Sequence, residues 1–289
     1  MKIAVVGASG NVGTAILRAL HKDPAVTDIV GISRRMPSSA VEPYAGVEWH
    51  SIDVTAKDAP QQLADAFSGA DAVIHLAWLI YPNHDRELIR RINVDGTRAA
   101  LKAADRAGIK RVVVASSIGA YSVDEARQEV DGPDDTPPLR KEDFPARGIE
   151  GSHYSEDKGK VEEILEEFTA EHPDISMAWL RPGLIFQDDA ASEVQRFFLG
   201  ESMPVELLDK GSLPVLPLPK KMVTQGVHAD DVAQAYLLAA KKPEATGAFN
   251  ICADDVLHPQ DFADVLSNGR FVELPAKIEG AFCVYLCRE

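Results

Sequence analysis

The sequence predicts an α/β fold built on a doubly wound parallel sheet, and three observations carry this prediction. Apolar runs of strand length alternate with amphipathic helical runs at the spacing of β-α-β units. Several apolar runs are nearly continuous, as in strands that helices cover on both faces. A glycine-rich turn joins the first apolar run to the first helical one. We therefore expect a Rossmann domain with a small C-terminal lobe.

The glycine-rich turn follows a strand predicted over residues 3–6. Gly7 permits a tight turn, Gly10 lets the backbone approach a pyrophosphate, and Gly13 allows the helix to pack closely on the strand. The helix that follows presents unpaired N–H groups to an anion. This context favours dinucleotide binding over glycines needed for backbone reasons alone. The expected cofactor contacts in the turn are Gly7, Ser9, Gly10, Asn11, Val12 and Gly13.

The second predicted strand, residues 29–33, ends where the two nicotinamide dinucleotides are distinguished. A carboxylate there holds the ribose 2′-hydroxyl, whereas an arginine accommodates a 2′-phosphate. The sequence offers Ser33, Arg34 and Arg35, and no acid. This favours NADP(H) over NAD(H), although two merely solvated arginines would leave the preference open.

The alternation of strands and helices continues along the chain. Strands are predicted over residues 47–53, 72–77, 111–117 and 175–180, and helices over residues 57–69, 84–107, 154–169 and 232–240. Ligands bind such sheets outside the carboxyl ends of the strands. The residues at those ends, which together predict one site, are Gly7, Arg34, Asp53, Ala77 and Ser117.

The regular alternation fails after residue 183, where prolines accumulate. We expect residues 1–183 and 227–250 to form the dinucleotide-binding domain. Residues 184–226 and 251–289 are then a substrate-binding lobe. An acidic, proline-rich stretch over residues 131–138 is expected at the surface, either as a solvated connection or over the substrate entrance.

The composition excludes some partners. The 289 residues include 30 basic and 45 acidic side chains, for a formal charge of −15, which repels nucleic acid and anionic membranes. No apolar run is long enough to span a bilayer, and the N-terminus carries no signal pattern. Cys252, Cys283 and Cys287 lack paired spacing and a ligand cluster. We therefore expect a cytoplasmic protein with free thiols and no metal site.

Tyr154 and Lys158 lie one helical turn apart on a single predicted helix face. A free tyrosine has a pKa of about 10, and a neighbouring positive charge lowers that pKa. Tyr154 beside Lys158 can thus exchange a proton with a substrate hydroxyl or carbonyl while hydride moves to or from a cofactor. Ser117, at the end of its strand, is placed to hydrogen-bond the same oxygen. Taken alone, this tyrosine–lysine spacing is also that of an exposed helix face.

Several motifs occur in the order seen in one protein family. They are the glycine turn, Asp53-Val54, His75-Leu76-Ala77, Asn93-Val94-Asp95-Gly96-Thr97, Ser116-Ser117 with Tyr121, Tyr154 to Lys158, Arg181-Pro182 and His228 to Ala233. Over residues 1–250 the chain resembles the extended short-chain dehydrogenase/reductases, and within them the NAD-dependent epimerase/dehydratase family.

The resemblance implies a role for each matched position. Tyr154 is the acid/base, Lys158 holds the nicotinamide ribose hydroxyls, and Ser117 orients the reacting oxygen. Asp53 and Val54 border the adenine. The expected cofactor contacts outside the glycine turn are Ser33, Arg34, Asp53, Val54, Leu76, Ala77, Asn93, Lys158, Pro182 and Leu184.

Departures from the family pattern narrow the expected reaction. Dehydratases place acids directly after the serine, where this chain has Ile118 and Gly119. NAD-retaining sugar epimerases usually carry an acid where Arg34 stands. We therefore expect an NADP(H)-using carbonyl reductase or alcohol dehydrogenase acting at a secondary alcohol or ketone. The alternatives are a nucleotide-sugar epimerase and, from another class, a non-catalytic NADP(H)-sensing regulatory protein.

Substrate contacts are not specified by any motif. Candidates for the cleft, each more often structural or solvent-exposed, are His84, Arg86, His153, Gln187 and Arg196. After Leu266 the sequence matches no pattern of the family, so we expect a substrate lobe that is minimal or altered. A homodimer formed through the helices predicted over residues 84–107 and 154–169 is a further expectation.

Overall fold

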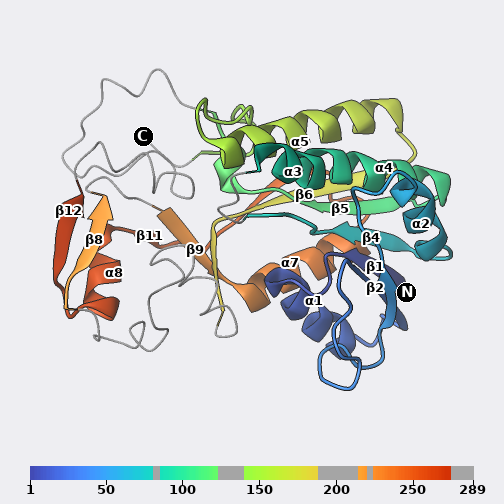
Figure 1. Ribbon diagram of the computed structural model, residues 1–289, viewed down its shortest axis with the longest axis horizontal. Helices are drawn as coiled ribbons and strands as arrows, with labels where there is room; N and C mark the ends of the chain where they lie inside the picture. The colour runs from blue at the N-terminus through green and yellow to red at the C-terminus, as the bar shows by residue number, and fades with distance from the viewer. Residues whose placement is uncertain (81–84, 123–139, 188–213, 220–223, 275–289) are drawn as a thin grey trace.

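The computed structural model describes residues 1–80, 85–122, 140–187, 214–219 and 224–274, and its centre is one seven-stranded parallel sheet (Figure 1). The strand order is β10-β6-β5-β4-β1-β2-β3. The strands are β1 (Lys2–Val6), β2 (Asp28–Ser33), β3 (Glu48–Ser51), β4 (Ala72–His75), β5 (Arg111–Ala115), β6 (Ser176–Pro182) and β10 (Gly247–Ile251). The predicted doubly wound parallel sheet is confirmed, and the strand order reverses between β1 and β4.

Helices cover both faces of the sheet, as the near-continuous apolar strands require. On one face α1 (Asn11–Lys22) packs against α7 (Ala229–Lys241). The other face carries α2 (Ala59–Ala66), α4 (Gly96–Arg106) and α5 (His153–Glu171). Each face of the sheet has its own apolar core, and successive residues of β1 point to the two cores alternately. Ala4 and Val6 pack in the core with α2, α4 and α5, whereas Ile3 and Val5 pack in the core with α1 and α7.

The helix predicted over residues 84–107 is not continuous. It consists of α3 (Arg86–Arg90), a π-helical turn η1 (Arg91–Asp95) and α4, and residue 84 lies outside the described part. The π-helical turn contains Asn93, whose amide accepts a hydrogen bond from the Leu79 backbone N–H at 2.7 Å and donates to the Leu79 carbonyl at 3.1 Å. A π-turn changes the direction of a helical side chain, and such turns occur at functional sites.

The region after β6 contains more regular structure than its sequence predicts. β7 (Leu184–Phe186), β9 (Thr224–His228) and β11 (Val256–Leu257) form a three-stranded sheet. β8 (Leu216–Pro219) and β12 (Phe271–Leu274) form a two-stranded one beside α8 (Pro259–Leu266). A small apolar cluster of Leu216, Leu218, Phe262, Leu266 and Phe271 holds this second sheet and α8 together. Strands this short give too few residues for a periodicity to be recognised.

The structure adds β10 to the predicted strands, as the edge neighbour of β6. β6 also runs through Arg181 and Pro182, which the sequence analysis placed beyond its end. Within the described residues, no helix is long and apolar enough to cross a membrane.

Candidate functional site

The candidate site lies at the carboxyl edge of the sheet, where the glycine turn follows β1. Gly7 has φ of +89°, and a Cβ there would lie 2.8 Å from the Ala77 backbone nitrogen. A Cβ on Gly13 would lie 2.5 Å from the Gly7 carbonyl oxygen. Packing within the chain therefore requires these two glycines.

Gly10 differs from the other two glycines of the turn. A Cβ there would meet only the Gly7 carbonyl oxygen, at 3.4 Å, and Gly10 is exposed. It is the N-cap of α1, yet no side chain caps the helix and its first turn contains no acid. The uncapped helix end beside an open glycine suits the pyrophosphate of a dinucleotide, whose charge the helix dipole favours. The residues present thus fit the expected cofactor.

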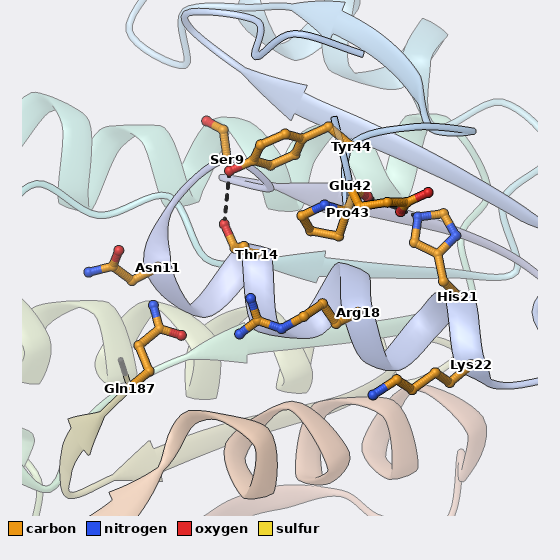
Figure 2. A pocket seen from close by; sticks show the side chains of 10 residues that line it. All are labelled: Ser9, Asn11, Thr14, Arg18, His21, Lys22, Glu42, Pro43, Tyr44 and Gln187. Atoms are coloured by element: carbon orange, nitrogen blue, oxygen red, sulfur yellow. Dashed lines mark hydrogen bonds between the residues drawn. The ribbon is translucent and has the colours of Figure 1, made fainter. Parts of the chain in front are cut away.

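A cavity of about 450 Å³ extends from the glycine turn along α1 (Figure 2). Thr14 and Tyr44 share a hydrogen bond of 3.2 Å that fastens the 42–44 segment to the helix. Gln187, which follows β7, lines the same cavity as Asn11 at the N-terminal end of α1 (Figure 2). Both polar atoms of the Gln187 amide are buried without a partner in the described part of the chain. The other lining residues are Ser9, Arg18, His21, Lys22, Glu42 and Pro43.

The residues after β2 and β3 form the expected adenine side of the site. Ser33 is buried, and its hydroxyl donates to the Arg35 carbonyl at 2.8 Å, whereas Arg34 is exposed. The Asp53 carboxylate accepts hydrogen bonds from the side chain and backbone of Thr55, which lower its pKa, and the charge of Arg34 lowers that pKa further. Arg34 and Asp53 are therefore neighbours, as their strand-end positions predict.

Ser117 and Tyr154 meet at Gly119. A Cβ on Gly119 would lie 2.9 Å from Cε1 of Tyr154 and 3.4 Å from Oγ of Ser117. The N-terminal end of α5 is fixed to this turn, because the Ser155 hydroxyl donates to the Gly119 carbonyl at 2.6 Å. The strand-end serine and the helical tyrosine, 37 positions apart in the chain, thus face the same small space.

Lys158 completes the group from the next turn of α5. Its Nζ lies 5.9 Å from the centroid of the Tyr154 ring and donates to the Ala115 carbonyl at 3.0 Å. Burial lowers the pKa of the Lys158 ammonium to about 7, while the charges of Glu162 and Asp157 act in the opposite direction. The structure therefore brings Ser117, Tyr154 and Lys158 together at one end of the sheet.

A buried polar network around Glu162 adjoins the group formed by Ser117, Tyr154 and Lys158. Glu162, one turn after Lys158 on α5, accepts hydrogen bonds from both Nε and Nη2 of Arg181, at 2.9 and 2.5 Å. The hydroxyl of Ser116 and the indole N–H of Trp179 also donate to Glu162. The sequence analysis did not identify Glu162, although an acid four residues after Lys158 lies on the same helix face.

Several expected cofactor contacts are already engaged within the chain. The side-chain amide of Asn93 is hydrogen-bonded to both the N–H and the carbonyl of Leu79, and Asn93 is 1% exposed. His75 is neutral, since burial lowers its pKa to about 4, and its Nε2 bonds the Thr97 hydroxyl. Leu76, Ala77, Pro182 and Leu184 lie at the same edge of the sheet, and Val54 packs where a Cβ on Gly96 would stand.

The candidate substrate residues are placed differently from one another. The guanidinium of Arg86 binds the buried carboxylate of Asp157 through two hydrogen bonds of 2.5 and 2.7 Å. His153 is 69% exposed and lies 3.5 Å from Glu156. His84 and Arg196, like Cys283 and Cys287, lie outside the described residues. Within the described part, no cluster of histidine, cysteine or acidic residues could hold a metal ion.

The sheet order, the glycine turn on β1 and the strand-end site define a dinucleotide-binding protein of the Rossmann class. The sequence model of the NAD dependent epimerase/dehydratase family matches residues 3–252, so the chain belongs to this family. Members of the family are NAD(P)-dependent enzymes, and the resemblance inferred from the motifs is confirmed.

Three known proteins illustrate what the chain is similar to. It is 36% identical over 116 residues to L-arabinose 1-dehydrogenase (NAD(P)(+)) of Haloferax volcanii, which covers 40% of this chain and 41% of that protein. It is 30% identical over 211 residues to cinnamoyl-CoA reductase 1 of Petunia hybrida, covering 72% of this chain and 58% of that protein. The Thermus thermophilus UDP-glucose 4-epimerase in complex with NAD shares the fold, with a TM-score of 0.68, 18% identity, and coverage of 97% and 93% of the two chains.

Proposed function

We propose that this protein is an NADP(H)-dependent oxidoreductase that transfers hydride at a secondary alcohol or ketone. The observation that carries the proposal is the convergence of Ser117, Tyr154 and Lys158 at the edge of the sheet where the glycine turn lies. Ala77, which follows β4, packs against Gly7 of the glycine turn. When bound, the dinucleotide supplies or accepts the hydride.

Each residue of the group has a distinct task in this proposal. Tyr154 gives a proton to the carbonyl oxygen during reduction and takes it back during oxidation. The Lys158 ammonium favours the phenolate form of Tyr154 through its charge. The Ser117 hydroxyl hydrogen-bonds the reacting oxygen and thereby fixes the carbonyl in place. The uncapped N-terminus of α1 and Gly10 hold the pyrophosphate, and Arg34 attracts a 2′-phosphate.

One departure from the family pattern disfavours dehydration. Ile118 and Gly119 follow Ser117, so no acid stands there to move the second proton that a dehydration requires. Nucleotide-sugar epimerisation is the second candidate, because the family description includes it. The two candidates differ in stoichiometry: a reductase consumes one NADPH per product, whereas an epimerase returns its cofactor unchanged.

The test is a panel of ketones, aldehydes, sugars and nucleotide sugars with NADPH or NADH, compared between wild type and Tyr154→Phe. We expect stoichiometric NADPH oxidation with at least one carbonyl compound, and a loss of turnover in Tyr154→Phe of at least a hundredfold. Cofactor binding should be nearly unchanged in that variant. Equal activity of the two proteins on every reacting substrate would refute the assigned mechanism. Tight NADPH binding without any turnover would favour a regulatory protein instead.

A further inference from the structure

Trp78, three residues after β4, lies against both members of the tyrosine–lysine pair. The centroid of its ring is 3.5 Å from Nζ of Lys158. Its plane stands at 78° to the Tyr154 ring, with the centroids 6.0 Å apart. A distance of 3.5 Å between an ammonium and an indole ring is well inside the range of a cation–π interaction. Neither the sequence motifs nor the family match assigns this residue a role.

Besides the indole face, the Lys158 ammonium contacts the Ala115 carbonyl, to which its Nζ donates a hydrogen bond of 3.0 Å. Within the described residues, no carboxylate is within 4.0 Å of its Nζ, because Asp157 pairs with Arg86 and Glu162 pairs with Arg181. The polar or charged groups facing Lys158 are Tyr154, Asp157 and Glu162 of α5, His75 of β4, the Ala115 carbonyl of β5 and, behind Glu162, Arg181 of β6. His75 is neutral, and the carboxylates of Asp157 and Glu162, although each is paired with an arginine, favour the charged form of Lys158 through their charge and without direct contact. The indole face and one carbonyl thus make the direct contacts that favour a charged lysine.

The backbone next to Trp78 is held rigidly, so its ring position is built into the fold. Asn93, from the π-helical turn, bonds both the N–H and the carbonyl of Leu79. The Trp78 ring is partly buried against the core formed with α2, α4 and α5. Its indole N–H is buried and has no hydrogen-bond partner among the described residues. Since the indole N–H makes no hydrogen bond that fixes the ring, the ring's contacts with the Lys158 ammonium and with the Tyr154 ring distinguish tryptophan at this position from an aliphatic residue.

We propose that Trp78 is a positioning residue of the site, whose indole face holds the Lys158 ammonium in its charged form beside Tyr154. The inference deepens the proposed function and rests on it for its significance in catalysis. The charge state of Lys158 can be measured without substrate or cofactor.

The experiment follows the titration of Lys158 by NMR, using lysine labelled at the ε-carbon and assigning the resonance by its loss in Lys158→Met. In wild type we expect an apparent pKa of about 7. Trp78→Leu keeps an apolar side chain but removes the π face, and we expect it to lower that pKa by about one unit. Trp78→Phe keeps a π face, so its shift should be less than half as large. The pH profile of turnover should shift in the same order.

A matched control separates the contact from a general effect of losing an indole. Trp49→Leu removes a partly buried tryptophan whose ring packs on Tyr44, and it should leave the Lys158 titration unmoved. Circular dichroism of each variant verifies folding, and Trp78→Phe alone carries the comparison if Trp78→Leu does not fold. In that comparison a pKa lowered by a few tenths of a unit supports the proposal, and an unchanged or raised pKa overturns it. The proposal is also overturned if Lys158 has the same pKa in Trp78→Leu and Trp78→Phe, or a higher pKa in Trp78→Leu. If the protein turns over no substrate of the panel but the Lys158 pKa values follow the expected order, only the proposed function is overturned.

Discussion

The carboxylate of Glu162 and the guanidinium of Arg181 form an ion pair that solvent does not reach, with 0% and 3% of their side chains exposed. The pair joins α5 to β6, directly beneath the turn that carries Lys158. Glu162 also accepts from Ser116 and Trp179, and Nη1 of Arg181 donates to the Tyr121 hydroxyl at 3.0 Å. A buried pair is costly to desolvate, and it is tolerated here because its polar atoms are bonded.

Removal of one partner from this pair should be strongly destabilising. Glu162→Gln leaves a buried guanidinium without its counter-charge, so we expect the free energy of unfolding to fall by about 3–5 kcal/mol in urea titrations. The control is Glu166→Gln, whose bond to Arg147 is about half exposed and should contribute little. The double variant Glu162→Leu with Arg181→Met should recover much of the lost free energy of unfolding. If the losses from the two single substitutions simply add in the double variant, the ion pair is not the cause of the destabilisation.

Lys158 should make stability depend on pH in a defined direction. Its folded pKa is lowered from 10.5 to about 7, mainly by burial. Between these values the unfolded chain binds a proton that the folded chain does not, so this group's contribution to the free energy of unfolding rises with pH. The contribution is fully present above the unfolded pKa and is lost as pH falls through 7.

The variant Lys158→Met removes this titration. We expect Lys158→Met to be more stable than wild type at pH 6, and the difference to shrink by about 2–3 kcal/mol by pH 9. Urea unfolding of both proteins at each pH measures this difference in the free energy of unfolding. A constant difference across this range would mean that Lys158 keeps an ordinary pKa in the folded protein.

The sequence was sufficient for six of the seven strands of the sheet and for the grouping of Ser117, Tyr154 and Lys158, because both depend on local patterns. The glycine turn, the strand-end serine and the tyrosine–lysine spacing each identify a position without reference to the rest of the chain. Arg86 shows the limit of this reasoning. A structural role was the more frequent expectation for Arg86, but its partner Asp157 is 71 residues away, and a contact of that range leaves no mark on local spacing.

The same limit applies to Trp78 and to β10. Trp78 follows an apolar strand, where an aromatic residue is ordinary core composition, and only the folded structure shows Lys158 beneath its ring. β10 is a short strand with every residue half-buried, so neither alternation nor a continuous apolar run marks it. Its place in the sheet comes from pairing with β6.

Gly119→Ala should impair turnover without unfolding the protein. The new methyl group would lie 2.9 Å from Cε1 of Tyr154, so the ring must move by a few tenths of an ångström. Gly119 sits in a 3₁₀ turn without a positive φ, so alanine suits its backbone. We expect turnover to fall about ten- to a hundredfold, as for a small misplacement of a catalytic group, with a change of less than about 1 kcal/mol in unfolding free energy. Unchanged turnover would show that the ring position is not critical.

Arg34→Asp should weaken NADP(H) binding more than NAD(H) binding. The exposed Arg34 guanidinium stands beside Asp53 at the strand ends, and its replacement would put a second negative charge where a 2′-phosphate is expected. We expect at least a tenfold selective loss of NADPH affinity, measured by fluorescence titration or calorimetry. Arg106→Asp makes the same change in net charge at the exposed C-terminal end of α4 and should affect both cofactors little. Equal weakening of both dinucleotides by Arg34→Asp would refute the 2′-phosphate assignment.

Gln187→Met should raise the stability of the cofactor-free protein. The buried Gln187 amide has no hydrogen-bond partner among the described residues, and burial of such a group costs free energy that methionine, of similar length and shape, does not incur. We expect the free energy of unfolding to rise by about 1 kcal/mol or more. Because Gln187 and Asn11 line the same cavity beside the glycine turn, NADPH affinity should be measured in the same variant (Figure 2). A loss of stability would mean that the amide is paired in solution, whereas a gain in stability with weaker NADPH binding would identify the cofactor as the partner that the amide lacks.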